Sequence, residues 1–185
     1  MFYKTRETVN QYIQMAKGYN GKSLIEKLIQ YLPEGNVLEL GSGSGNDIPI
    51  LQQHYKLTAS DFSPLFLEYI KTQYPNVEVK LIDAKSITLD CHYDGIYSNK
   101  VLQHLNEEEL KVSLQSQKEI LKDSGIICHS FWAGTGQDNF GNIIHKYYTK
   151  EELEQIISEN YNILNIENYK EMEEQDSILV IAQVK

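Results

Sequence analysis

The stretch Val37–Gly45, VLELGSGSG, decides the fold of this chain. A short apolar run ends at Leu40, and glycines follow at alternate positions, 41, 43 and 45. Glycine lets the backbone turn sharply and approach a ligand with no Cβ in the way. Asn46 and Asp47 then open a predicted helix, whose first N–H groups face the same ligand. The segment therefore predicts a strand, a ligand-binding turn and a helix in succession.

The spacing of these glycines separates two classes of ligand. A dinucleotide-binding turn has the pattern G-x-G-x-x-G, which rests a pyrophosphate on the helix N-terminus. Here the sixth position is Asn46, and the acid Glu39 stands two residues before Gly41. This form suits a ligand with an amino-acid tail and no pyrophosphate, and it disfavours a nicotinamide-dependent oxidoreductase. The glycines alone would also fit a purely structural turn.

Two acids at the ends of the next predicted strands strengthen the ligand hypothesis. Asp61 lies 20 residues beyond Gly41, where an acid accepts hydrogen bonds from ribose hydroxyls in Rossmann-like folds. Phe62 beside it would flank a nucleoside. Asp83-Ala84 follows the third strand, where the carboxylate can accept from an adenine amine and the next N–H can donate to a ring nitrogen. Each acid by itself could also be a cap or surface residue.

Strand and helix signals alternate along the rest of the chain. Seven short runs rich in β-branched residues are predicted strands: 36–40, 56–61, 77–83, 94–99, 125–132, 162–169 and 178–184. Ser63-Pro64, Asn106 and Thr149 give helix-start signals between them. About eight residues join the last two strands, too few for a crossover helix. We therefore expect an α/β fold, a doubly wound, mostly parallel, seven-stranded Rossmann-like sheet with helices on both faces and a C-terminal antiparallel hairpin.

Together these motifs resemble those of the class I S-adenosylmethionine (SAM)-dependent methyltransferases. Residues 39–45, Asp61, Asp83-Ala84 and residues 94–104 (DGIYSNKVLQH) look like motifs I to IV of that family, in order and spacing. The resemblance covers the chain from about Gly21 to its end. It implies a single methyltransferase domain over residues 1–185, with residues 1–32 as a helical cap. It also implies SAM as the cofactor and S-adenosylhomocysteine (SAH) as the product.

The resemblance assigns expected roles to the cofactor-binding residues. Glu39 would contact the methionine amino group, Asp61 the ribose and Asp83 the adenine. Backbone at Ser98 and Asn99 would line the methionine side, and Tyr12 would close over the cofactor. The expected set is Tyr12, Glu39, Gly41, Ser42, Gly43, Gly45, Asp61, Phe62, Asp83, Ala84, Ser98 and Asn99.

Departures from two related motif sets exclude two chemistries. Enzymes that methylate the exocyclic nitrogen of adenine, or glutamine, carry an Asn/Asp-Pro-Pro-aromatic tetrapeptide after strand four, where this chain has residues 98–101, SNKV. Cytosine C5 enzymes need a cysteine that follows a proline in that region. Cys91 has no such neighbour.

Residues near the ends of strands four and five are the candidates for the acceptor side. Histidine titrates near neutrality, so His104 and His129 are candidate proton acceptors, although each could also be a packing residue. Trp132 could wall an apolar acceptor pocket. Residues 133–148, the longest irregular segment, are expected to form a lid over the acceptor, with His145 as a candidate substrate contact.

Composition and charge limit the kinds of partner that we expect for this chain. The net charge is −9, and nine acids with one lysine fall between residues 151 and 176, which indicates a solvated acidic face. A basic stripe for a phosphate backbone is missing from the sequence, so we expect no nucleic-acid partner. No apolar run approaches the roughly 20 residues that span a bilayer, and the N-terminus does not look like a signal peptide. We therefore expect no membrane association and a cytoplasmic location. Cys91 and Cys128 lack metal-ligand spacing, so no metal is expected.

The methyl acceptor is the open question. A chain of 185 residues leaves little room for a recognition domain, which favours a small-molecule acceptor. Two alternatives stay open. One is a protein or RNA methyltransferase that works with a partner. The other is a non-catalytic module that binds SAM or SAH, since the sequence shows no unmistakable catalytic base.

Overall fold

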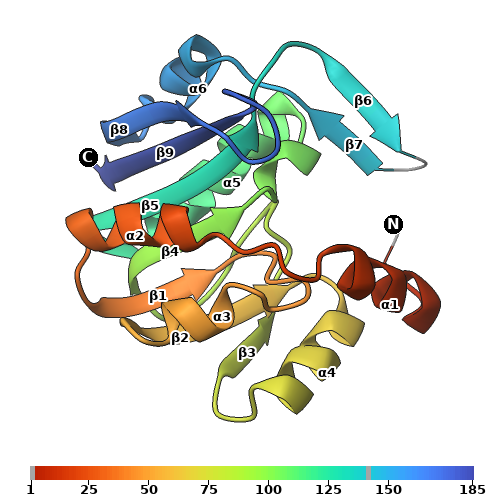
Figure 1. The fold of residues 1–185 in the computed structure, drawn as a ribbon. Helices are drawn as coiled ribbons and strands as arrows, with labels where there is room; N and C mark the ends of the chain where they lie inside the picture. Colours follow the sequence, from red (N-terminus) through yellow and green to blue (C-terminus); the bar gives the residue numbers. More distant parts are fainter. Residues whose placement is uncertain (1–2, 141–142) are drawn as a thin grey trace.

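A seven-stranded sheet forms the centre of the fold (Figure 1). The computed structural model describes residues 3–140 and 143–185. In space the strands run in the order β3 (Glu78–Leu81), β2 (Tyr55–Asp61), β1 (Gly35–Glu39), β4 (Tyr93–Asn99), β5 (Leu121–Trp132), β9 (Ser177–Val184) and β8 (Tyr161–Tyr169). The first five pair in parallel, whereas β9 pairs antiparallel with both β5 and β8. The expected α/β architecture with its C-terminal antiparallel hairpin is confirmed.

Helices cover both faces of this sheet, so that its central strands are buried on both sides. On one face α2 (Lys22–Tyr31), α3 (Ile48–Leu51) and α4 (Pro64–Gln73) pack in one apolar cluster with Val37. On the other face α5 (Glu107–Glu119) and α6 (Lys150–Ile157) pack in a second cluster with Leu38. Val37 and Leu38 are neighbours on β1, and successive side chains of a strand point to opposite faces. Burial on both faces explains why the consecutive residues Val37 and Leu38 are both apolar.

The helix starts follow the predicted signals, with one exception. Asn106 and Thr149 each form a complete capping box, at the starts of α5 and α6. Ser63 is the N-cap of α4, and Pro64 is its first residue. The helix expected to open at Asn46 begins two residues later: α3 starts at Ile48 and has four residues. The side chain of Asp47 makes no capping bond there, because it is used to hold the N-terminal segment, as described below.

The expectation that residues 133–148 are irregular was wrong. They contain a two-stranded antiparallel hairpin, β6 (Gln137–Phe140) and β7 (Ile143–Lys146). Its strands have four residues each, which is too short to give a periodic strand signal. The hairpin lies beyond the edge toward which the parallel strands point, on the same side of the sheet as α1 (Arg6–Met15) (Figure 1). Residues 1–2 of the expected cap and 141–142 of the expected lid lie outside the described residues.

The length and composition of the helices are relevant to membrane association. Within residues 3–140 and 143–185, none combines the length and apolar character that crossing a membrane requires.

Candidate functional site

The loop after β1 is shaped by its three glycines. Gly41, Gly43 and Gly45 all have positive φ angles, of 64°, 50° and 74°. A Cβ at Gly41 would lie 2.6 Å from a methyl carbon of Val101, so a larger residue does not fit there. The loop is tied to β2, because the Ser42 N–H donates to the Ser60 carbonyl at 2.7 Å. The backbone geometry of the loop therefore agrees with the predicted turn.

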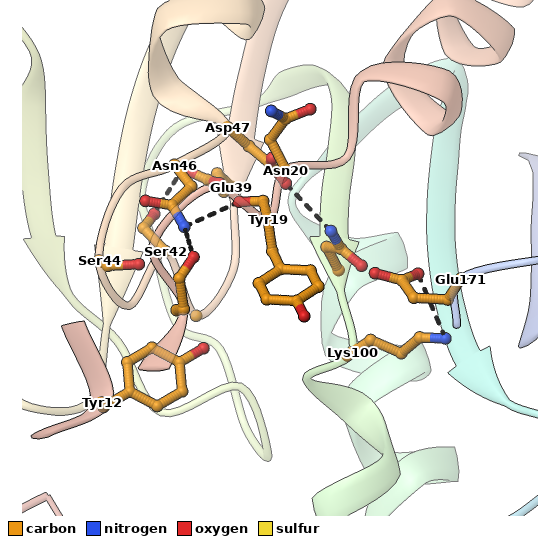
Figure 2. Close-up of a pocket in the computed structure, with 13 residues that line it drawn as sticks. Tyr12, Tyr19, Asn20, Glu39, Ser42, Ser44, Asn46, Asp47, Lys100 and Glu171 are labelled. Atoms are coloured by element: carbon orange, nitrogen blue, oxygen red, sulfur yellow. Dashed lines mark hydrogen bonds and ion pairs between the residues drawn. The ribbon is translucent and has the colours of Figure 1, made fainter. Parts of the chain in front are cut away.

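Two cavities adjoin this glycine loop at the carboxyl edge of the sheet. We call cavity A the one lined by, among others, Tyr19, Glu39, Ser42, Ser44, Asn46, Asp47 and Glu171 (Figure 2). Cavity B is lined by Tyr3, Asp61, Phe62, Phe66, Val101 and His104, with Gly43. Both linings include Tyr12, Gly41, Asn99 and Lys100. Cavities A and B are therefore neighbouring parts of one groove that follows the glycine loop.

Glu39 is a buried carboxylate at the base of cavity A. It is 4% exposed, and the Ser42 hydroxyl donates to its Oε2 at 2.6 Å. Burial, and then the charge of Asp47, raise the pKa of Glu39 to about 8. A raised carboxyl pKa means that the ionised form lacks stabilising positive charge. A cationic ligand group beside Glu39 would supply that charge.

Asp61 holds a comparable position in cavity B. Its side chain is 4% exposed and accepts from the N–H groups of Gly43 at 3.0 Å and Ser63 at 2.8 Å. Burial raises the pKa of Asp61 to about 6, although these backbone bonds oppose the rise. The glycine loop and the strand-2 carboxylate are thus joined directly, as their predicted shared role requires.

An aromatic cluster covers the glycine loop. The rings of Tyr3, Tyr12 and Phe66 contact one another with centroid distances of 5.1 to 5.3 Å. A Cβ at Gly43 would lie 3.1 Å from the Tyr12 ring. The structure therefore brings Tyr12 from α1 onto the loop, and its expected contact with the cofactor stays a prediction.

Asn46 and Asp47 fasten the N-terminal segment beside this loop. The Asn46 amide donates to the carbonyls of Ala16, at 2.7 Å, and Tyr19, at 2.8 Å. Asp47 accepts from the Gly21 N–H at 2.5 Å and from the Tyr97 hydroxyl at 2.7 Å. Sequence reasoning assigned both residues only to a helix start. Their importance for the site depends on contacts across 26 to 50 positions.

The remaining predicted cofactor residues divide between the cavities and other places. Asn99 lines both cavities and links the Ser130 hydroxyl, at 2.7 Å, to Asp47, at 3.3 Å. Ser98 is fully buried and faces away from Asn99, as neighbours on a strand do. Asp83 is exposed after β3, where it accepts from the Lys85 N–H at 3.0 Å. Asp83 and Ala84 lie outside the linings of cavities A and B, as does Gly45.

His129 lies in the core rather than in either cavity. It is fully buried, with Nδ1 at 2.8 Å from the Ser98 hydroxyl and Nε2 at 2.8 Å from Oε1 of Gln117. Burial lowers the pKa of His129 to about 3, so the ring is neutral at physiological pH. The side chain links β4, β5 and α5, and we propose no proton-transfer role for it.

His104 and His145 meet at the outer side of cavity B. His104 belongs to the short 3₁₀ helix η1 (Leu102–His104) and lines cavity B, whereas His145 comes from the hairpin. Their ring centroids are 4.6 Å apart, and burial lowers the pKa of each. The Nδ1 atom of His104 lies 2.9 Å from the Ile144 carbonyl. Because a carbonyl only accepts, Nδ1 carries the proton and Nε2 keeps its lone pair.

Lys100 and Glu171 are site residues that sequence reasoning missed. Lys100 follows β4 directly with a φ of 57°, an uncommon conformation for a residue with a side chain. Its ammonium lies 3.8 Å from the centre of the Trp132 ring and 3.8 Å from a carboxylate oxygen of Glu171. Trp132 thus faces Lys100 and lies outside both linings. A lysine at the end of strand four was a possible signal for this site. No local signal pointed to Glu171.

The described residues give no sign of a metal centre. Among residues 3–140 and 143–185, no three or more His, Cys, Asp or Glu side chains gather in a way that could hold an ion.

Comparisons with known proteins concern the domain and the fold. Residues 37–125 match the family model described as a methyltransferase domain. Among solved structures, a SAM-dependent methyltransferase from Clostridium acetobutylicum ATCC 824 is 14% identical with a TM-score of 0.77, and the match covers 96% of this chain and 98% of that one. The N-methyltransferase NodS from Bradyrhizobium japonicum WM9 is 14% identical with a TM-score of 0.76, covering 96% and 97%.

A third solved structure is similar over most of this chain. The 1,6-didemethyltoxoflavin-N1-methyltransferase from Burkholderia thailandensis is 17% identical with a TM-score of 0.78, covering 96% of this chain and 85% of that one. These likenesses establish the fold, and the family match covers the glycine loop, Asp61 and the end of β4. Residues 37–125 therefore match a methyltransferase domain, and the chain as a whole has the Rossmann-like fold of class I SAM-dependent methyltransferases.

Proposed function

We propose that this protein binds SAM and transfers its methyl group to a small molecule. The observation that carries the proposal is the meeting of Glu39 and Asp61, two buried carboxylates with raised pKa values, on either side of one glycine loop. SAM carries an ammonium group, a sulfonium group and a ribose. Cations and hydroxyl donors are the groups that stabilise ionised carboxylates. The residues present therefore fit the cofactor.

Each part of the groove has a proposed role toward the cofactor. Glu39 binds the ammonium group of the amino-acid tail in cavity A, and Asp61 accepts from the ribose hydroxyls in cavity B. Phe62 flanks the nucleoside, and Tyr12 covers the loop at Gly43, where its ring lies closest. We keep Asp83 and Ala84 as the proposed adenine contacts. Asp83 is exposed and Ala84 is half-buried after β3, and both lie outside the linings of cavities A and B.

The chemistry asks little of the protein beyond positioning. When bound, SAM supplies the electrophilic methyl group, so the chain contributes alignment and exclusion of water. His104 is the proposed proton acceptor, because it lines cavity B and its Nε2 lone pair is fixed by the bond from Nδ1 to Ile144. Its lowered pKa keeps the ring neutral near pH 7, as a base must be.

Two segments complete the proposed site. The N-terminal cap, within residues 1–32, covers cavity A, where the amino-acid tail of the cofactor would lie. Asn46 and Asp47 hold the cap in this position through hydrogen bonds to Ala16, Tyr19 and Gly21. The segment 133–148 acts as the acceptor-side lid through its hairpin, which contacts η1 at His104. His145 would then approach the acceptor beside His104.

Small-molecule acceptors are favoured by size and by the neighbours. The toxoflavin enzyme was crystallised with 1,6-didemethyltoxoflavin and SAH, and it matches over nearly the whole of this chain. The glycopeptide N-methyltransferase MtfA, a neighbour with a TM-score of 0.76, shows that related folds also serve larger acceptors. A partner-dependent protein or RNA methyltransferase and a non-catalytic binding module are the alternatives.

One labelling experiment separates these three functions. The protein is incubated with methyl-labelled SAM and a cell extract split into fractions below and above about 1 kDa. Label in the small-molecule fraction supports the proposal. Label in protein or RNA alone supports the partner-dependent alternative, and no transfer by a protein that binds SAH supports the binding module. The variant His104→Gln should lower transfer, and its Kd for SAH is measured alongside so that both proteins are compared at saturating SAM.

A further inference from the structure

Glu171 reaches the cofactor groove from the far end of the chain. It lies in the connection between β8 and β9 and lines cavity A together with Asn99 and Lys100 (Figure 2). It also lines a neighbouring cavity, which we call cavity C, with Tyr19, Asn20 and Tyr169. Glu171 therefore lies between the groove and a second opening, where a molecule other than the cofactor can reach it.

The connection that carries Glu171 is built by one aspartate. Asp176 accepts from the N–H groups of Glu171, at 2.9 Å, Met172, at 2.9 Å, and Glu173, at 2.8 Å. These bonds fix the backbone on the C-terminal side of Tyr169. The Glu171 side chain is 19% exposed, and the Tyr169 hydroxyl donates to its Oε2 at 2.8 Å. The carboxylate is thus held in place before any ligand arrives.

Cavity A is lined by more acidic than basic side chains. Its lining contains Glu39, Asp47 and Glu171 but one basic side chain, Lys100. The Lys100 ammonium donates to the Phe131 carbonyl at 3.1 Å and to the Ser177 hydroxyl at 2.5 Å, and it lies 3.8 Å from Oε2 of Glu171. Within the described residues, Oε1 of Glu171 has no hydrogen-bond partner. That oxygen is available to a ligand.

Aromatic rings and Glu171 surround the Lys100 ammonium group, although burial still lowers the pKa of Lys100 to about 8. The Lys100 ammonium lies 3.8 Å from the centre of the Trp132 ring and 5.1 Å from that of Tyr169. Aromatic faces attract cations, and desolvated sites strengthen that attraction. Tyr19, 54% exposed and shared by cavities A and C, offers another ring on the open side. An anionic acceptor would meet repulsion here, whereas an ammonium group would meet a carboxylate and aromatic surface.

We propose that the acceptor carries an ammonium group at neutral pH, that Oε1 of Glu171 binds this group, and that the methyl group goes to another atom of the acceptor that has a free lone pair, because an ammonium nitrogen has none. Glu171 is then a specificity-determining residue, and the acidic C-terminal connection is part of the site rather than only a solvated face. This inference rests on the proposed function, because it assigns the substrate class of the same site.

The test compares two probes that differ mainly in charge. The protein is saturated with SAH and titrated with 2-phenylethylamine or with 3-phenylpropionate, which pair the same ring and a similar chain with opposite charges. A charge-assisted hydrogen bond predicts that the amine binds at least about tenfold more tightly. In Glu171→Gln this preference should disappear when the variant is saturated with SAH, at a concentration set from the variant's own Kd for SAH. Glu171→Asp keeps the charge and should keep part of the preference.

Glu174→Gln is the matched control. It removes the same charge from the same connection, but the Glu174 side chain is 81% exposed and pairs with Lys170. The control should bind the amine as the wild type does. Equal binding of the two probes by the wild type, or an equal loss of preference in Glu174→Gln, would overturn the inference. Absence of SAH binding would instead contradict the proposed function on which it rests.

Discussion

Binding of SAH should release a proton, because the buried carboxyl group of Glu39 must ionise to hold an ammonium group. Its pKa in the free protein is raised to about 8 by burial and by Asp47. An ammonium group beside it favours the ionised form and lowers that pKa in the complex. Affinity for SAH should therefore increase as the pH rises toward 8.

The size of the effect follows from the pKa. At pH 7 a carboxyl group with a pKa of about 8 is roughly one-tenth ionised. About 0.9 proton should therefore leave per SAH bound at pH 7. The ionised fraction rises about twentyfold between pH 6 and pH 7.5, and the association constant should rise by a similar factor. Over this range the ligand amino group stays largely protonated.

Calorimetry in two buffers measures this release. SAH is titrated in phosphate and in Tris at the same pH, and the difference in apparent enthalpy gives the number of protons exchanged. The control ligand is 5′-methylthioadenosine, which keeps the adenosine that faces Asp61 but lacks the amino-acid tail. Its affinity should show a smaller pH dependence, and Glu39→Gln should remove most of the difference between the two ligands. An SAH affinity that is constant from pH 6 to 7.5, with no proton released, would refute the reasoning.

Three other outcomes follow from the structure. Gly43→Ala should cost about 1 kcal/mol of unfolding free energy and weaken SAH binding at least about fivefold, because φ is 50° and the new Cβ would lie 3.1 Å from Tyr12. The control for this variant is Gly136→Ala, which has a φ of 83° and no atom within 4 Å of its Cβ. Its backbone strain should also lower the free energy of unfolding measured by urea denaturation, but it should bind SAH normally. His129→Ala should lower the free energy of unfolding by about 2–4 kcal/mol, because Ser98 and Gln117 lose their buried partner, and an unchanged stability would contradict that network. Because folding lowers the pKa of His129 to about 3 from 6.5, the wild type should lose stability as the pH falls from 6.5 toward 3, and this variant should lose less.

The sequence could predict those features that depend on residues close together in the chain. The glycine turn needs positive φ angles at three positions, and Asp61 ends the neighbouring strand, so both follow from the order of elements. The capping boxes at Asn106 and Thr149 depend on residues three positions apart. These signals sufficed for the sheet, for the helix starts and for the acids that meet at the groove.

The features that were missed depend on long-range packing. Glu171 reaches Lys100 across 71 positions, and no pattern near residue 171 distinguishes it from the other acids of its connection. His129 could be placed on a strand, but whether it faced a helix or a cavity depended on the register between β5 and α5. The hairpin β6–β7 has four residues per strand, too few for a periodic signal. Tertiary contacts decided each of these cases.

The central claim is that the groove between Glu39 and Asp61 binds SAM, and calorimetric titration with SAH tests it most directly. The wild-type protein should bind SAH with a micromolar or lower Kd. Asp61→Asn, which keeps the shape of the side chain but loses its charge, should bind at least about tenfold more weakly, as expected for hydrogen bonds to a charged group. Binding of NAD with no binding of SAH, or equal SAH affinity in the wild type and Asp61→Asn, would contradict the account.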